Sequence, residues 1–171
     1  MYLENNRRRR PAVGPIISWI LVVLWMAVIF FLSAQDGTQS GSLSGSIAAV
    51  LYPLLSGRQD PEGQLAFESV LRTLAHGGIY FILALLVCLA LVKSRVRDIG
   101  SMVVTFLICA VYAASDEIHQ AYVPGRASEW VDFLVDMAGV IIGIVLFHVI
   151  SALRYLNRQR KAANTSEYLK I

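Results

Sequence analysis

The stretch that decides the fold is FLVDMAGVIIGIVLFHVI, from Phe133 to Ile150. It is apolar almost throughout, and a helix of roughly 20 such residues crosses a hydrocarbon core about 30 Å thick. Asp136 interrupts the apolar run. A carboxylate within a membrane helix is costly and is usually retained for a function. The stretch therefore predicts a membrane-spanning helix that contributes to a site.

Three further apolar runs and the composition place the rest of the chain in the membrane as well. Of the 171 residues, 56% are hydrophobic and 16% are charged, whereas a soluble domain is about a quarter charged. Backbone groups in lipid must be paired internally, so each run is expected to be helical. We therefore expect an all-α, polytopic membrane protein built as a bundle of four transmembrane helices. The predicted helices are 16–34, 74–92, 99–115 and 133–150, within a membrane domain at 16–150.

The basic residues predict the orientation of this bundle. They gather in three clusters: Arg7 to Arg10, then Lys93, Arg95 and Arg97, then Arg154, Arg158, Arg160 and Lys161. The positive-inside rule places such clusters in the cytoplasm, so the N-terminus 1–15, the 93–98 link and the tail 151–171 are expected there. Segments 35–72 and 116–132 then lie outside. The net charge of +3 reflects this orientation, and no nucleic-acid partner is expected.

The first apolar run has an alternative interpretation as a cleaved signal peptide, because a basic segment precedes it. The run is longer than is usual for such peptides, and Leu32 is a poor residue for a cleavage site that needs small side chains. A retained first helix is therefore the preferred interpretation.

The segment between the first two predicted spans is longer than a simple connection. Its glycine- and serine-rich part, 37–46, is expected to be flexible, and the apolar piece 47–55 is too short to span and contains Pro53. We interpret this piece as an interfacial or re-entrant segment. Asp60 followed by Pro61 is a helix start, and the helix that begins there is expected to lie on, or lean into, the outer membrane surface.

Polar side chains recur at helical spacing near the outer ends of all four predicted spans. Asp116 and His119 share one face of the third helix, and His76 and Tyr80 lie one turn apart in the second. The predicted topology brings these ends to one membrane level, so we expect a single polar site. The candidate catalytic residues are His76, Asp116, Glu117 and Asp136. The candidate binding residues are Ser33, Gln35, Tyr80, Gln120, Arg126 and Asp132.

The acids in this group outnumber the cations. Such a balance favours a divalent metal, proton exchange or general acid–base catalysis over simple anion binding. The candidate metal ligands are His76, Glu117 and His119. Structural roles are the alternatives: His76 as an interfacial residue, Asp132 as a helix cap and Arg126 in a salt bridge.

Four small residues are expected to serve packing. Gly139 and Gly143 form a small-xxx-small pattern that lets another helix approach closely. That helix belongs either to this chain or to a second copy, so an oligomer through these glycines is one expectation. Cys88 and Cys109 are expected at different depths of antiparallel helices, as apolar packing residues without a disulfide.

Four sequence pieces resemble one family. They are FLSAQ at 31–35, LAHGGIY at 74–80, SDEIHQ at 115–120 with PGR at 124–126, and Asp132 with DMAG at 136–139 and Gly143. In combination they are similar to the VanZ-like family of small bacterial membrane proteins, named after a teicoplanin-resistance protein. The likeness covers about 19–147, and Ser-Ala-Gln at 33–35 departs mildly from a Ser-Ser-Gln-like form. The resemblance implies a four-helix protein of the bacterial cytoplasmic membrane, linked to the cell envelope and, in some members, to lowered glycopeptide sensitivity. It implies no established reaction.

Three functional interpretations follow. In the first, the polar cluster binds or acts on an envelope component at the outer leaflet, such as a lipid-linked precursor or a glycopeptide-related component. In the second, the protein is an accessory scaffold whose polar cluster holds the helices together in the lipid bilayer. In the third, the protein is a small ion- or proton-coupled transporter.

Overall fold

The computed structural model describes residues 13–35, 37–96, 98–125 and 130–168. Within these ranges the chain forms helices and no strands. The helices are α1 (Val13–Ser33), α2 (Gly37–Ser56), α3 (Pro61–Lys93), α4 (Asp98–Gln120) and α5 (Trp130–Tyr168). Four of them, α1, α3, α4 and α5, are long and apolar enough to cross a membrane. The expected all-α, polytopic architecture is therefore confirmed.

Helix α3 is longer than the predicted second span. It contains 33 residues because the helix that starts at Pro61 continues into the span without a break. Its start is capped as predicted, since the carboxylate of Asp60 accepts a hydrogen bond of 2.8 Å from the backbone N–H of Gly63. The expected surface helix and the second span are thus one element.

A tight turn joins α3 to α4. Arg95 adopts a left-handed conformation with φ of 69°. The backbone N–H of Val96 then reaches the carbonyl of Leu91 at 2.9 Å, and that of Arg95 reaches the carbonyl of Val92 at 3.1 Å. This Schellman pattern satisfies the last carbonyls of α3. It reverses the chain, so α3 and α4 form a helical hairpin.

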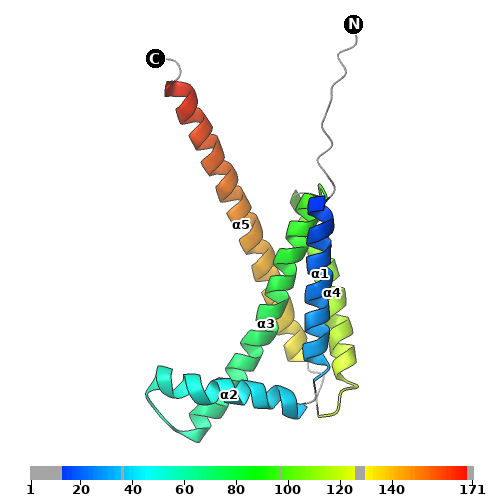
Figure 1. The fold of residues 1–171 in the computed structure, drawn as a ribbon, viewed down its shortest axis with the longest axis vertical. Helices are drawn as coiled ribbons and strands as arrows, with labels where there is room; N and C mark the ends of the chain where they lie inside the picture. Colours follow the sequence, from blue (N-terminus) through cyan, green and yellow to red (C-terminus); the bar gives the residue numbers. More distant parts are fainter. Residues whose placement is uncertain (1–12, 36, 97, 126–129, 169–171) are drawn as a thin grey trace.

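The glycine- and serine-rich segment 37–46 is helical, which differs from the flexible segment predicted. It forms the first half of α2, and the helix continues through Pro53 to Ser56. Pro53 lies in the last turn, where the missing N–H removes a single hydrogen bond at the end of the ladder. In Figure 1, α2 lies across the lower end of the bundle. It packs on α3.

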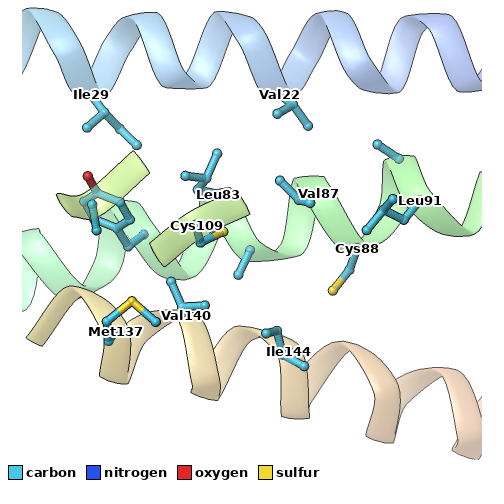
Figure 2. Packing of buried hydrophobic residues seen from close by; sticks show 14 residues of the cluster. Val22, Ile29, Leu83, Val87, Cys88, Leu91, Cys109, Met137, Val140 and Ile144 are labelled. Carbon is cyan, nitrogen blue, oxygen red and sulfur yellow. The ribbon is translucent and has the colours of Figure 1, made fainter. Parts of the chain in front are cut away.

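Helix α3 is the centre of the bundle, because it contacts each of the other four helices. Figure 2 shows the apolar core around it, with side chains from α1, α3, α4 and α5. The labelled residues are Val22, Ile29, Leu83, Val87, Cys88, Leu91, Cys109, Met137, Val140 and Ile144. The outer faces of the spans carry exposed large apolar side chains, such as Val23, Val111 and Leu134. Such a surface is suited to lipid, and it supports a membrane-embedded protein.

The two cysteines are buried free thiols. The Sγ atom of Cys88 lies 3.3 Å from the hydroxyl of Thr105, which is one turn from Cys109 on α4. The two thiols therefore lie at different levels along the helices, about one turn apart, as predicted.

Candidate functional site

Buried polar side chains from four helices gather at one end of the bundle. This is the end where α1 and α4 finish and where α5 begins, near α2 in Figure 1. Ser33, Tyr80, Asp116, Glu117, Gln120 and Asp136 are all buried there, and His76 is half-buried. The cluster consists of two groups that differ in their hydrogen bonding.

The first group, which we call the α1–α4 triad, consists of Ser33, Asp116 and Gln120. The hydroxyl of Ser33 donates to Oδ2 of Asp116 at 2.8 Å. The amide nitrogen of Gln120 donates both to that carboxylate oxygen and to the Ser33 hydroxyl, each at 3.1 Å. Hydrogen bonds to a carboxylate are stronger than those between neutral groups. The triad therefore ties the end of α1 to α4 with its polar atoms paired.

Two further hydrogen bonds hold α1 in place below the triad. The indole N–H of Trp25 donates to the backbone carbonyl of Ile79 at 2.9 Å. The hydroxyl of Tyr112 donates to the carbonyl of Met26 at 2.6 Å. These bonds fix α1 against both α3 and α4, so Ser33 arrives at a defined position.

The second group, which we call the α3–α5 group, consists of His76, Tyr80 and Asp136. Nδ1 of His76 lies 3.7 Å from Oδ1 of Asp136, which is an ion-pair distance when the histidine is protonated but too long for a hydrogen bond. Asp136 has no exposed surface, and neither of its carboxylate oxygens has a hydrogen-bond partner among the described residues.

Tyr80 completes the α3–α5 group and joins it to the triad. It is fully buried, and its hydroxyl lies close enough to the carboxylates of Asp116 and Asp136 to interact with both charges. Within the described part of the chain this hydroxyl makes no hydrogen bond. The group therefore contains buried polar atoms whose pairing is incomplete.

Glycine packing brings Asp136 to His76. A side-chain carbon at Gly139 would collide with the backbone carbonyl of Gly77, and one at Gly143 would lie 2.9 Å from the carbonyl of Phe81. The backbones of α3 and α5 therefore touch one turn from the two charged residues. The helix that these glycines accommodate is α3 of the same chain. An oligomer through these glycines stays a prediction that this packing does not support.

The remaining predicted residues take separate positions. Glu117 is buried beside Asp116 on α4, and Asp132 is half-buried in the first turn of α5, where its charge acts on Asp136. Gln35 is half-buried just beyond α1. Arg126 falls outside the described residues.

The predicted metal ligands do not form a metal centre. Among the described residues no group of three His, Cys, Asp or Glu side chains is arranged to hold a metal ion. The ring of His119 instead stacks on Phe30 of α1, with ring centroids 4.7 Å apart and planes at 7°. Because this stacking places His119 in the contact between α1 and α4, His76, Glu117 and His119 do not converge.

A cavity of about 450 Å³ adjoins the cluster, between α1, α2 and α3. Ser33 and His76 belong to both the cavity lining and the polar cluster. The sequence did not predict this cavity, and Arg72 and Ser44 in its lining were not identified. A signal for Arg72 was present, because Arg72 lies four residues before His76 and so on the same helix face.

Comparison with known proteins agrees with this architecture. A sequence model of the VanZ/LLP1 family matches residues 18–151, which is well over half of the chain. Comparison with curated proteins and with solved structures finds no match. The family match covers the four apolar helices and the polar cluster between them. The chain therefore belongs to the VanZ/LLP1 family and is a multi-pass membrane protein.

Proposed function

We propose that the protein binds a cell-envelope component at the outer face of the bacterial cytoplasmic membrane, through the α3–α5 group. The observation that carries this proposal is Asp136, which is fully buried while both of its oxygens lack a hydrogen-bond partner among the described residues. A buried polar group without partners costs several kcal/mol. A ligand with hydroxyl or amide donors would supply those partners, and such donors are abundant in envelope precursors.

The charge distribution supports the outer location. The basic link with Lys93 and Arg95 lies at the C-terminal end of α3, across the apolar part of the helix from His76, and the basic residues of α5 lie beyond its apolar run. By the positive-inside rule that end faces the cytoplasm. Thiol labelling of single-cysteine variants in intact cells tests the orientation: a cysteine at position 125 should react from outside, and one at 95 only after permeabilisation. The reverse pattern would contradict the proposed location.

The α3–α5 group also has the components for proton transfer. Histidine titrates near neutral pH, and His76 is paired with Asp136 at a distance of 3.7 Å. The pair can hold a proton at Nδ1 of His76 and release it to a ligand that enters beside it. We therefore propose His76 and Asp136 as the residues that act on the ligand, with Glu117 and Asp132 at the margin of the site.

A scaffold role is the second candidate, and the α1–α4 triad favours it. Its hydroxyl, amide and carboxylate groups are paired with one another. They therefore need no ligand. If every polar group of the cluster were hydrogen-bonded in this way, the cluster would only hold the helices together.

Two isosteric substitutions distinguish the candidates. Asp136→Asn and Glu117→Gln preserve shape and remove charge, so a binding site predicts loss of function at nearly unchanged thermal stability and yield. The measurements are melting of the detergent-solubilised protein and teicoplanin susceptibility of cells that express each variant, with exposed Glu62→Gln as the matched control. If function falls only in proportion to folded protein, the scaffold role is correct and the proposal is wrong.

A further inference from the structure

The cavity beside the polar cluster has mainly hydrocarbon walls. Leu32 from α1, Ile47 from α2 and Leu71 from α3 line it, together with Leu74, Ala75 and Ile79. Its volume of about 450 Å³ falls in the range of sites that hold a small organic ligand. Walls of this kind select an apolar chain, because a polar ligand would lose its hydration there without gaining partners.

The charge of the lining favours a ligand that has an anionic group at one end of its hydrocarbon chain. Arg72 is the one permanently charged residue in the lining, and no described Asp or Glu belongs to it. Glu68 lies next to the lining, but its carboxylate accepts a hydrogen bond of 2.8 Å from Ser44. An arginine in such a setting favours phosphate or carboxylate, with which it forms charge-assisted hydrogen bonds.

The position of Arg72 along α3 matches the level of lipid phosphates. The helix ends at Lys93 on the basic side, and roughly 20 residues are needed to cross the hydrocarbon core. Counting back from Lys93 brings the other edge of the core close to Leu74. Arg72 then lies just outside the hydrocarbon, while the apolar lining residues Ala75 and Ile79 lie inside it.

Helix α2 forms one wall of the cavity. It contributes Ser44 and Ile47 to the lining, and it is fixed to α3 at two places. One is the bond between Ser44 and Glu68, and the other is a 2.8 Å bond from the hydroxyl of Tyr52 to Asp60. We call this cavity between α1, α2 and α3 the slot.

From these observations we infer that the slot holds the hydrocarbon chain of an anionic phospholipid or lipid phosphate, with its phosphate at Arg72 and its head group directed to His76. The inference rests on the proposed function and specifies the substrate class of the same site. The ligand would reach His76 and Asp136 from the slot, because His76 belongs to the slot lining and is also paired with Asp136.

The test measures lipid binding to the purified full-length protein in a non-ionic detergent by native mass spectrometry. The probes are phosphatidic acid, phosphatidylcholine and inorganic phosphate. Wild type is expected to bind phosphatidic acid roughly tenfold more tightly than phosphatidylcholine, the scale of one charge-assisted contact. Inorganic phosphate should not displace the lipid, because it leaves the apolar slot empty. Equal binding of the two lipids, or displacement by phosphate, would overturn the inference.

Substitutions locate the binding in the slot. Ala75→Trp fills the slot from α3 and Ile47→Trp fills it from α2, and each is expected to weaken phosphatidic acid binding at least about tenfold. Ala66→Trp is the matched control, since Ala66 is exposed on α3 and outside the lining. Arg72→Gln should abolish the preference for phosphatidic acid, whereas Arg58→Gln, an exposed residue outside the lining, should keep it. Circular dichroism and melting verify that each variant is folded.

The outcome also separates this inference from the proposed function. If both tryptophan variants bind lipid as wild type does while Asp136→Asn abolishes function, the slot assignment is wrong and the proposed function stands. If the tryptophan variants lose lipid binding while Asp136→Asn remains fully functional, the slot binds lipid and the proposed function is wrong.

Discussion

The α1–α4 triad and the α3–α5 group lie at the same end of the bundle but differ in how their polar atoms are paired. In the triad, Asp116 accepts two hydrogen bonds. In the α3–α5 group, Asp136 accepts none from the described residues, and Nδ1 of His76 lies 3.7 Å from its Oδ1. Buried polar groups in folded proteins are almost always paired. The triad is therefore paired internally, whereas the incomplete pairing of the α3–α5 group is what the proposed ligand-binding role rests on.

The largest effect is expected from a substitution that separates α3 from α5 and leaves the triad intact. Gly139→Leu places a side chain against the backbone of Gly77, so α5 must move away from α3. Overpacking of this kind costs about 1–3 kcal/mol, and more when backbone is the obstacle. We expect a fall in unfolding free energy of about 3 kcal/mol together with loss of function. Thermal and denaturant unfolding in detergent measure this fall in unfolding free energy. Ala138→Leu, on the exposed face of α5, is the control. Equal stability of the two variants would contradict the close contact between α3 and α5.

The second largest effect is expected from a substitution that removes the acceptor of the triad. Asp116→Ala leaves the Ser33 hydroxyl and the Gln120 amide without their acceptor, and each buried unpaired group costs about 1–3 kcal/mol. We expect a loss of about 2–3 kcal/mol, and a smaller loss for Ser33→Ala. A double-mutant cycle of these two substitutions should give a coupling energy of at least about 0.5 kcal/mol. Strict additivity would show that the triad is not a connected unit.

The third effect sharpens the comparison by making the same change in both groups. Asp116→Asn removes charge from a carboxylate that accepts two hydrogen bonds, whereas Asp136→Asn removes it from one that accepts none among the described residues. Asp136→Asn should therefore change the unfolding free energy by less than about 1 kcal/mol, and Asp116→Asn should cost more. Melting curves recorded side by side decide the matter. A larger loss of unfolding free energy for Asp136→Asn than for Asp116→Asn would show that the α3–α5 group, and not the triad, has the structural role.

The smallest effect comes from an exposed hydrogen bond that serves as a reference for the buried groups. The Tyr52 hydroxyl, and then the Gly63 amide, lower the pKa of Asp60 below its ordinary value of 3.8. A lowered carboxylate pKa stabilises the fold above the ordinary pKa, and the contribution is lost as pH falls through the lowered value. Tyr52→Phe should thus lower the melting temperature slightly at neutral pH, and the difference should shrink as the pH falls below the ordinary pKa of 3.8 and through the lowered pKa. A difference that persists in acid would mean that the bond contributes through packing and not through charge.

Much of the fold could be predicted because apolar length and basic clusters are local properties of the sequence. The four spans, the cap at Asp60 and the small-residue face of α5 all followed from residue spacing. The helical state of 37–46 could not be predicted, because glycine and serine have low helix propensity. That segment is helical because α2 packs on α3, as in the bond between Ser44 and Glu68.

The site was predicted as one cluster because spacing and topology fix which helix ends meet. Its division into two groups depends on distances between helices, which the sequence does not contain. His119 illustrates the difficulty: it shares a helix face with Asp116, yet its ring stacks on Phe30 instead of joining a metal centre. The cavity was missed for the same reason, since three helices have to be placed before the space between them is defined.

The order of the helices along the chain has a consequence for biogenesis. Every member of the triad is synthesised before Asp136, since α1 and α4 precede α5, and membrane proteins, like other chains, emerge from the ribosome N-terminus first. The short turn at Arg95 joins α3 and α4, and Ser33 of α1 bonds to Asp116 of α4, so the partners of α1 in the triad do not depend on α5. The costly carboxylate of Asp136 is thus synthesised after His76 and Tyr80, the two residues that accompany it in the α3–α5 group. A chain that stops before α5 would keep the triad residues but would lack Asp136 together with the core side chains Met137, Val140 and Ile144.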